Sequence, residues 1–294
     1  MRFIPSKMGV FALAMLAVVL ASCSGNEEEA SSSVSTVDVD PSASTVQQVS
    51  FRSAALDREM NLNVYVPSDY DPGQRYPVLY LIHGYGGDEK AWVDLGIDKA
   101  ADRLIADGRI TPLLIVMPEM NNSYGINSSQ GKYEDFLAKD VVDYVDAHYS
   151  TIVDRSGRSI GGLSMGGFIS LHTAFLHPDL FSKVGGHSPA IFVDDWSTTG
   201  GEHGIKAFLY PTDEARRERD PLLLAETVDL SALEVYLDCG DQDYYKFYDG
   251  SEKLYRLLQS KGVSVQYHHK PGEHDGAYWT SMAEDYLLFY DGAS

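Results

Sequence analysis

Stretches with the pattern of buried strands alternate with stretches of helical pattern over most of this chain. This alternation restricts the fold more than any other feature. Three strand stretches are dominated by apolar residues: "YPVLYLIHG" (76–84), "TPLLIVMPE" (111–119) and "LEVYLDCG" (233–240). Such runs are typical of strands covered on both faces. The alternation predicts an α/β fold with a mostly parallel central sheet and helices on both faces.

Weaker patterns complete this sheet. Residues 48–55 and 60–67 are predicted to be an antiparallel pair of strands, and 159–164, 183–190 and 263–272 are further predicted strands. Helices are predicted at 91–107, 133–149, 168–179, 245–262 and 278–290. In sheets of this kind, the functional groups gather in loops after the carboxyl ends of the strands.

The first residues have the pattern of a targeting segment. Arg2 and Lys7 form a short basic region before an apolar run, "MGVFALAMLAVVLA", that is short for a membrane span and is followed by Cys23 within "LASC". This ending resembles the bacterial lipoprotein signal, in which the cysteine becomes the lipidated first residue. We therefore expect a signal peptide at 1–22, lipidation at Cys23 and a lipid-anchored location in the bacterial cell envelope, periplasmic or at the surface. A plain secretory signal with a chance cysteine is the alternative.

Composition separates a tether from a folded domain. Residues 23–46 are acidic, serine-rich and poor in large apolar side chains, which predicts a flexible tether. Residues 47–294 have the length and composition of one globular domain. The formal net charge of −20 argues against nucleic acid as a partner. Cys239 is the single cysteine beyond the signal, so we expect neither an intrachain disulfide nor a cysteine-based metal site. Nothing in the sequence indicates the oligomeric state.

The segment "SIGGLSMGGF" (159–168) contains a serine with two glycines close on each side. Its centre, Gly162 to Gly166, matches Gly-x-Ser-x-Gly between a predicted strand and a predicted helix. This is the pattern of the nucleophile elbow of α/β-hydrolases, a strained turn that exposes the serine hydroxyl and leaves room for small neighbours only. An ordinary tight turn would also use glycine. The strand-to-helix context favours Ser164 as a nucleophile.

A serine nucleophile needs a histidine base, and chain order selects one. In this fold the order is serine, acid, histidine, so the base follows the strand at 233–240. His268 and His269 lie within a predicted strand, where we expect one side chain in the core and the other directed away from the site. His274 lies in the loop beyond that strand. His274 is the predicted base.

The acid that orients the base should lie just past the preceding strand. "LDCGDQDYY" offers Asp238, Asp241 and Asp243. Asp238 is still at the strand end, and a turn at Gly240 would bring either later carboxylate near the histidine. All three could instead solvate a turn. Spacing alone does not choose between Asp241 and Asp243.

Two backbone N–H groups are needed to hold an oxyanion. One is expected from Met165, the residue after the nucleophile, and the other from the glycine-rich loop "HGYGG" (83–87), where Tyr85 is the predicted donor. A thiol enzyme using Cys239 is disfavoured, because neighbouring acids raise the pKa of a thiol.

The motifs "LIHGYGG", "GLSMGG", "LDCGDQD" and "GEHDGAYW", in this order, resemble the esterase family that includes S-formylglutathione hydrolase, feruloyl esterases, enterochelin esterases and the antigen 85 mycolyltransferases. The resemblance covers roughly 47–290. It implies a single-domain α/β-hydrolase without a cofactor, with Ser164 as nucleophile, His274 as base and Asp243 as acid, the last of an Asp-x-Gly-x-x-Asp pattern. Glu119 departs from the family pattern and puts the acyl or alcohol preference in doubt.

These features predict a secreted serine carboxylic ester hydrolase that forms an acyl-serine intermediate. Its substrate is expected to be a small-molecule or polysaccharide-linked ester, with a carbohydrate-linked or aromatic acyl group favoured. The alternatives are an acyltransferase of the mycolyltransferase type with the same triad, and an inactive surface binding protein. Residues 191–230 fit no strand–helix alternation, which leaves open a cap insertion over the site or a solvated helix and loop.

Overall fold

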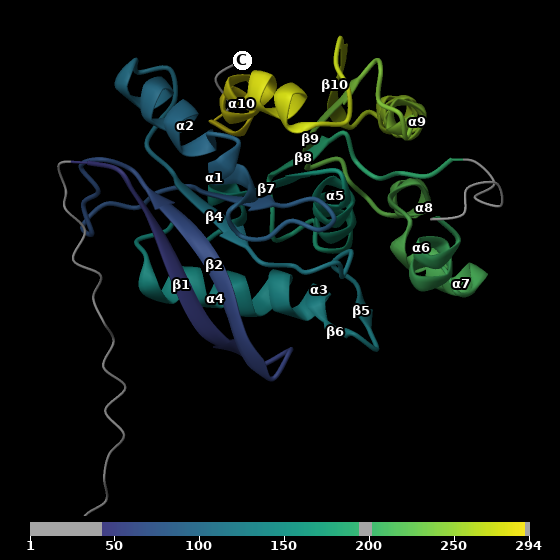
Figure 1. Cartoon of the computed structure of the whole chain (residues 1–294), viewed down its shortest axis with the longest axis horizontal. Coiled ribbons are helices and arrows are strands. Elements are labelled where there is room, and N and C mark those ends of the chain that lie inside the picture. Colours follow the sequence, from purple (N-terminus) through teal and green to yellow (C-terminus); the bar gives the residue numbers. More distant parts are fainter. Residues whose placement is uncertain (1–42, 194–201, 292–294) are drawn as a thin grey trace, which may run out of the picture. The chain divides into compact units, whose positions relative to one another are not determined.

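The computed structural model describes residues 43–193 and 202–291, and its strands follow the alternation in the sequence (Figure 1). One sheet has eight strands in the order β1-β2-β4-β3-β7-β8-β9-β10. The strands of this sheet are β1 (Thr45–Ser53), β2 (Arg58–Val66), β3 (Val78–Ile82), β4 (Leu114–Pro118), β7 (Arg158–Leu163), β8 (Lys183–His187), β9 (Glu234–Gly240) and β10 (Ser264–Lys270). β5 (Asn127–Ser128) and β6 (Gly131–Lys132) form a separate hairpin.

The sheet is mixed but mostly parallel. β1 pairs antiparallel with β2, and β2 pairs antiparallel with β4. The pairs from β4 to β10 are all parallel. The predicted α/β fold, with an antiparallel start and a parallel centre, is confirmed.

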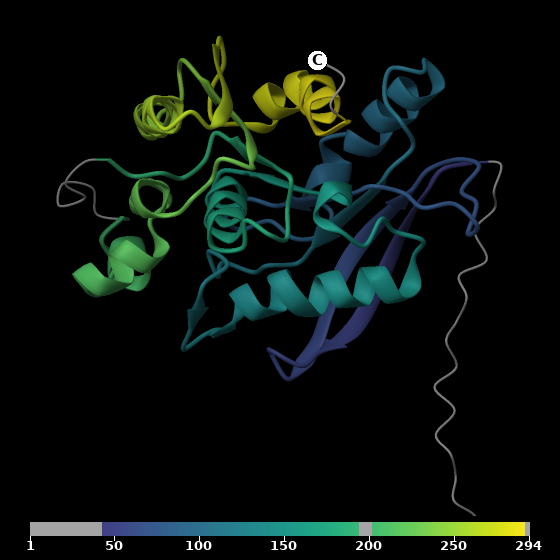
Figure 2. The same cartoon turned by 180° about the vertical axis from the view of Figure 1, so that it is seen from behind.

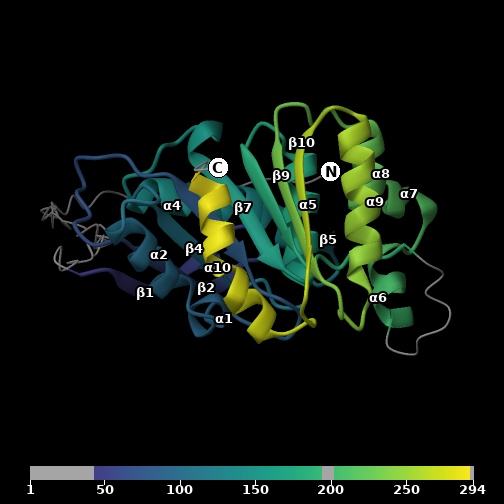
Figure 3. The same ribbon diagram turned by 90° about the horizontal axis from the view of Figure 1, so that it is seen from above.

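Helices cover both faces of the sheet, as predicted. The helices are α1 (Ala91–Asp94), α2 (Ile97–Ala106), α3 (Tyr133–Asp135), the π-helix η1 (Phe136–Val141), α4 (Val142–His148), the 3-10 helix η2 (Arg155–Gly157), α5 (Met165–Leu176), α6 (Glu202–Leu209), α7 (Asp213–Arg219), α8 (Pro221–Thr227), α9 (Phe247–Ser260) and α10 (Gly276–Asp291). α1, α2 and α10 pack in one core, and α4, α5, α8 and α9 pack in the other. Figure 3 shows α10 lying over the sheet.

Two predicted helices differ in detail from the structure. The single helix expected at 91–107 is two helices, because Gly96 between them has a left-handed φ of 79°. The helix expected at 133–149 runs through α3, η1 and α4, with a π-helical segment at its centre. Figure 2 shows this helix crossing the hairpin of β1 and β2, where Phe51 stacks on Tyr144 with ring centroids 4.5 Å apart.

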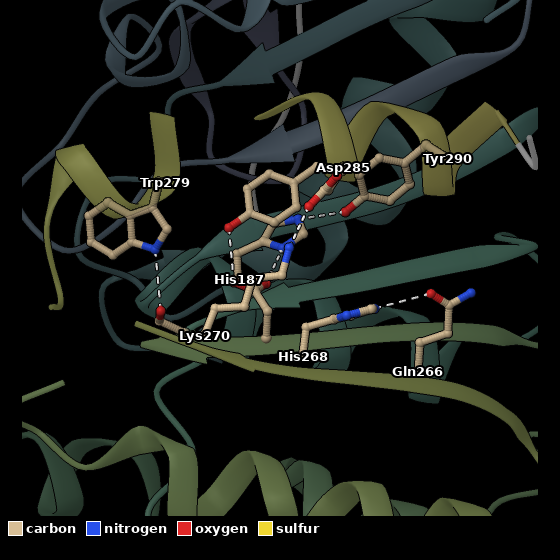
Figure 4. A network of polar contacts seen from close by, with 10 residues as sticks. His187, Gln266, His268, Lys270, Trp279, Asp285 and Tyr290 are labelled. Atoms are coloured by element: carbon tan, nitrogen blue, oxygen red, sulfur yellow. Dashed lines mark hydrogen bonds and ion pairs between the residues drawn. The ribbon is translucent and has the colours of Figure 1, made fainter. Parts of the chain in front are cut away.

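The expectation that His268 or His269 lies in the core is wrong. Both belong to β10, which is an edge strand and has no fully buried residue. His268 stacks on Tyr236 and contacts Gln266 (Figure 4), while His269 is exposed. An edge strand has a neighbour on one side only, so its side chains are covered less completely.

Several sequence-based expectations fall on residues outside those described. These are the signal peptide at 1–22, lipidation at Cys23 and most of the tether at 23–46, although β1 already begins at Thr45. Among the described residues, no helix has the length and apolar character to cross a membrane.

Candidate active site

Ser164 occupies the sharp turn between β7 and α5. Its backbone has φ 56° and ψ −116°, a conformation that is rare for residues other than glycine. Hydrogen bonds hold the turn from both sides: the Ser164 N–H donates to the His187 carbonyl at 2.8 Å, and its carbonyl accepts from the Ala190 N–H at 3.0 Å. The sequence-based nucleophile therefore lies at the predicted strand-to-helix turn.

Two of the flanking glycines are required by close backbone contact. A Cβ atom at Gly162 would lie 2.5 Å from the Gly166 backbone. At Gly166, a Cβ atom would lie 2.2 Å from the carbonyl oxygen of Ile82 in β3. No side chain fits at either position, because the obstructing atoms are backbone.

Ser164, His274 and Asp243 form one hydrogen-bonded chain. Nε2 of His274 lies 2.9 Å from Ser164 Oγ, and its Nδ1 lies 2.8 Å from Asp243 Oδ2. The Asp243 side chain is fully buried, and its Oδ1 accepts from the Tyr245 N–H at 2.8 Å. Since an ionised carboxylate only accepts, Nδ1 of His274 carries the proton, and Nε2 is left free to accept one from the serine.

Asp241, the other acid that spacing left open, does not reach His274. Its side chain is exposed and accepts from the Gly272 N–H at 3.2 Å, so it joins the loop after β9 to the loop after β10. The structure thus places Asp243 in hydrogen-bond contact with His274, whereas Asp241 makes no such contact.

The buried Cys239 thiol contacts the same carboxylate, with Sγ 3.3 Å from Asp243 Oδ2. Burial and the neighbouring Asp243 raise the pKa of Cys239. The thiol therefore stays protonated and serves as a hydrogen-bond donor to Asp243, which agrees with its exclusion as a nucleophile.

The glycine-rich loop after β3 is held by His83. Burial lowers the pKa of His83, so its imidazole is neutral near pH 7. Nε2 accepts from the Met120 N–H at 2.9 Å, so Nδ1 carries the proton and donates to the Gly84 carbonyl at 2.7 Å. The sequence reasoning missed this role. The signal that could have shown it is a histidine directly between a buried strand and the glycine loop.

Of the two predicted oxyanion donors, Tyr85 lies within this loop and Met165 directly follows Ser164. Met165 is the first residue of α5, so its N–H has no acceptor within the helix. Among the hydrogen bonds of the described residues, the Tyr85 N–H has no backbone acceptor either. Neither N–H group therefore has a backbone acceptor among the described residues, and both remain the predicted oxyanion donors.

A cavity of about 950 Å³ opens at Ser164 and His274. Its other lining residues are Gly84, Tyr85, Asn122, Tyr124, Gln130, Leu163, Ala190, Phe192, Gly204, Ile205, Phe208, Tyr244, Tyr245, Phe247 and Trp279. Eight of these are aromatic, and the lining named here contains no Asp, Glu, Lys or Arg. Glu119, the departure from the family pattern, is not among them. The site is suited to a neutral, partly aromatic ligand.

The segment 191–230 contributes to this cavity in part. Gly204, Ile205 and Phe208 of α6 belong to the lining, whereas α7 is largely exposed and carries an ion pair between Arg217 and Glu214. Residues 194–201 lie outside those described. The position of α6 is consistent with a cap insertion over the site, and that of α7 is consistent with a solvated helix.

Comparisons with known proteins identify the family of the chain and structures with a similar fold. Residues 53–287 match the family described as "Putative esterase". The chain is 34% identical over 153 residues to the endo-1,4-beta-xylanase/feruloyl esterase of Xylanibacter ruminicola, which is 48% of this chain but 21% of that protein. It is 21% identical over 259 residues to the acetyl esterase of Caldicellulosiruptor saccharolyticus, covering 80% of this chain and 93% of the relative. A solved ferulic acid esterase superposes with a TM-score of 0.74 at 25% identity, covering 85% of this chain and 98% of that one.

Proposed function

This chain belongs to the esterase family of α/β-hydrolases, and on that premise we propose that Ser164, His274 and Asp243 are the catalytic triad of a serine esterase for aromatic acyl esters of carbohydrates. The observation that carries the choice of substrate is the uncharged, aromatic lining of the cavity at Ser164.

The proposed reaction follows from the hydrogen-bonded chain. Ser164 Oγ attacks the ester carbonyl while His274 Nε2, at 2.9 Å, accepts its proton. Asp243 stabilises the imidazolium that forms. The N–H groups of Met165 and Tyr85 hold the negative oxygen of the tetrahedral intermediate. His274 then protonates the departing alcohol, and in the second half it activates a water molecule that releases the acid from Ser164.

The inner part of the cavity is suited to the acyl group. Phe247 and Trp279 are buried and contact the His274 ring, with centroids 5.3 and 5.0 Å away. Phe192 packs edge-on against Phe247. Aromatic rings favour offset or edge-to-face contact with another ring, so these walls support a hydroxycinnamoyl-type acyl group. The names of two relatives, a feruloyl esterase and a ferulic acid esterase, agree with this choice.

The outer part of the cavity is suited to a sugar. Among the described residues five large apolar side chains are exposed, and three of them, Tyr85, Tyr244 and Tyr245, line this cavity. Asn122 and Gln130 add amide groups at the same cavity. Tyrosine faces pack on the C–H surface of sugar rings, and amides hydrogen-bond to hydroxyl groups. This combination supports a carbohydrate as the alcohol of the ester.

Hydrolysis of methyl ferulate and of a feruloylated arabino-oligosaccharide by the full-length protein tests the proposal, with Ser164→Ala and His274→Ala as variants. We expect turnover by the native protein and a loss of roughly a thousandfold or more in kcat for each variant. Product analysis separates free ferulate from transfer to an added sugar. Labelling of Ser164 by a fluorophosphonate without turnover of either ester would contradict the substrate, and absence of labelling would contradict the nucleophile.

We also propose lipidation at Cys23 and a place in the bacterial cell envelope, on the support of the sequence pattern alone. Cells that express the chain with labelled palmitate should incorporate label into the native protein and none into Cys23→Ala. Label in both would contradict this assignment.

A further inference from the structure

A second histidine–carboxylate pair lies on the α10 side of the sheet and has no part in the proposed reaction. Nδ1 of His187, in β8, lies 2.8 Å from Asp238 Oδ1, in β9, and both side chains are fully buried. Tyr286 donates to the other carboxylate oxygen of Asp238 at 2.9 Å. Tyr290 Oη lies 2.9 Å from His187 Nε2 (Figure 4). Each side-chain nitrogen and oxygen of the pair therefore has a partner.

The directions of these hydrogen bonds follow from the carboxylate. Asp238 only accepts, so His187 donates from Nδ1, and Nε2 of the neutral imidazole accepts from the Tyr290 hydroxyl. Burial and the nearby Asp238 raise the pKa of Tyr286 and of Tyr290, which keeps both hydroxyls protonated as donors. One consistent arrangement of protons satisfies all four side chains.

Two glycines in the sheet leave space for the Tyr290 side chain of this network. A Cβ atom at Gly161 would lie 1.7 Å from Tyr290 Oη, and one at Gly185 would lie 2.0 Å from it. Gly161 is one of the four glycines beside the elbow, and its Cβ atom would meet Tyr290 rather than the backbone of the turn. Burying polar groups is unfavourable unless they are fully paired, and an apolar cluster would satisfy the core equally well. Stability alone therefore does not account for the network.

The backbone of the same residues holds the candidate active site. The His187 carbonyl accepts the Ser164 N–H at 2.8 Å, and the Asp238 carbonyl accepts the Ser188 N–H at 2.9 Å. Ser188 Oγ in turn accepts from the Trp279 indole at 3.3 Å, and Trp279 packs against the His274 ring. The network thus joins the strand ends that support the serine to the helix that follows the histidine.

We infer that His187, Asp238, Tyr286 and Tyr290 form a positioning network that fixes the distance between Ser164 Oγ and His274 Nε2. None of the four side chains lines the cavity, so they act through the backbone of β8 and β9 and through α10. Hydrogen bonds are directional, whereas apolar contacts allow small shifts that a nucleophile and its base do not tolerate. The inference rests on the proposed function of the triad.

Tyr290→Phe tests the network by removing one hydroxyl, and Tyr236→Phe is its matched control. Tyr236 is also buried and lies against His187 with ring centroids 5.8 Å apart, but its hydroxyl has no hydrogen-bond partner among the described residues. We expect Tyr290→Phe to lower kcat for a neutral ester about tenfold with KM unchanged, and to slow fluorophosphonate labelling of Ser164 similarly. The Tyr236→Phe variant should stay within about twofold of the native protein in both measurements.

Gly185→Ala provides a second variant, because its methyl group would displace the Tyr290 hydroxyl. A Cβ atom at Gly185 would also lie 2.9 Å from Tyr290 Cζ and 3.0 Å from His187 Cε1, so we expect Gly185→Ala to lower kcat at least as much as Tyr290→Phe. Unchanged kcat and labelling rate in folded Tyr290→Phe would overturn the inference, even if the melting temperature fell. A labelled Ser164 in a protein that hydrolyses no ester would instead contradict the proposed function, and the labelling rates of the variants would still test the network.

Discussion

Ser164 has a backbone conformation that is unfavourable for a residue with a side chain. Such strain costs of order 1–3 kcal/mol and persists only where surrounding contacts enforce it. Here the enforcement comes from hydrogen bonds to His187, Ala190 and Phe168, which hold the backbone groups of Ser164. The serine hydroxyl is thereby directed to the cavity rather than into the sheet.

At the same scale, the two aspartates after β9 should respond differently to loss of charge. Asp243→Asn removes the acceptor that fixes the proton on His274 Nδ1, so we expect kcat for methyl ferulate to fall by about 10³–10⁴. Asp241→Asn changes an exposed loop contact and should stay within a few-fold of the native rate. Equal losses in steady-state assays of the two variants would contradict the assignment of Asp243 as the acid.

At the scale of elements, the site is assembled by the strand order. The elbow follows β7, the glycine loop follows its neighbour β3, and the loops with Asp243 and His274 follow β9 and β10. All these strands are parallel, so their carboxyl ends meet at one edge of the sheet. The strand order therefore brings the site residues, which are far apart in the chain, to the same edge of the sheet.

The close packing of the elbow predicts that one added methyl group strongly lowers the free energy of unfolding. Gly166→Ala would place Cβ 2.2 Å from the Ile82 carbonyl, so the strand and the helix would have to move apart. We expect a loss of about 3 kcal/mol or more in the free energy of unfolding, or failure to fold. Gly204→Ala, in helix α6, is the control: no atom of the described residues outside the helix's own backbone lies within 4 Å of the new Cβ, so the change should be neutral or slightly stabilising. Denaturant titration of both variants measures their free energies of unfolding. A Gly166→Ala variant as stable as the native protein would contradict the close contact.

For the whole molecule, the contrast between surface charge and cavity is the main electrostatic feature. The formal net charge of the chain is −20, and the described lining of the cavity has no cationic side chain apart from His274 in its protonated form. An anionic substrate would be repelled at a distance and would find no partner inside.

This contrast predicts selectivity for neutral esters. The ratio kcat/KM for p-nitrophenyl butyrate should exceed that for p-nitrophenyl hydrogen succinate by roughly tenfold or more at low salt. The difference should shrink as ionic strength rises to about 0.15 M, because salt screens the repulsion. The neutral ester serves as the control for general salt effects. A faster reaction with the succinate would indicate a cation outside the described lining.

Stability of the whole molecule should depend on pH through the buried His83 and the half-buried Glu134. Burial lowers the pKa of His83 below its ordinary 6.5, so the unfolded chain binds more protons in that range and stability is lost as pH falls below about 6.5. His172 and His177 lower the pKa of Glu134 from 4.5 to about 2, so its contribution is lost in a separate range, as pH falls from 4.5 towards 2.

Melting temperatures measured from pH 7.5 to 5 test the first of these ranges. The native protein should lose stability on acidification, and the variant His148→Gln, at an exposed position, should behave in the same way. His83→Gln should start less stable and show a flatter profile. An unchanged slope in His83→Gln would contradict the role of this histidine.

Much of the architecture was predictable because it depends on local patterns. Apolar runs, helical spacing and the glycine-flanked Ser164 report burial and steric limits that act over a few residues, and they predicted the sheet, its helices and the elbow. Chain order left three histidines, and the position of His274 in the loop beyond a predicted strand selected it. The break at Gly96 and the incomplete burial of His268 and His269 were missed, since they depend on the path of a loop and on which strand forms the edge of the sheet.

The sequence by itself determined the α/β alternation, the position of the nucleophile turn and the order of its partners. Without the family resemblance, it left Asp241 and Asp243 equivalent, and the structure separates them by burying one beside His274 and exposing the other. Only the tertiary structure showed that Gly161 makes room for Tyr290, which is more than a hundred residues away. The physical reason is that contacts between distant segments depend on strand order and loop path, and no local pattern records either.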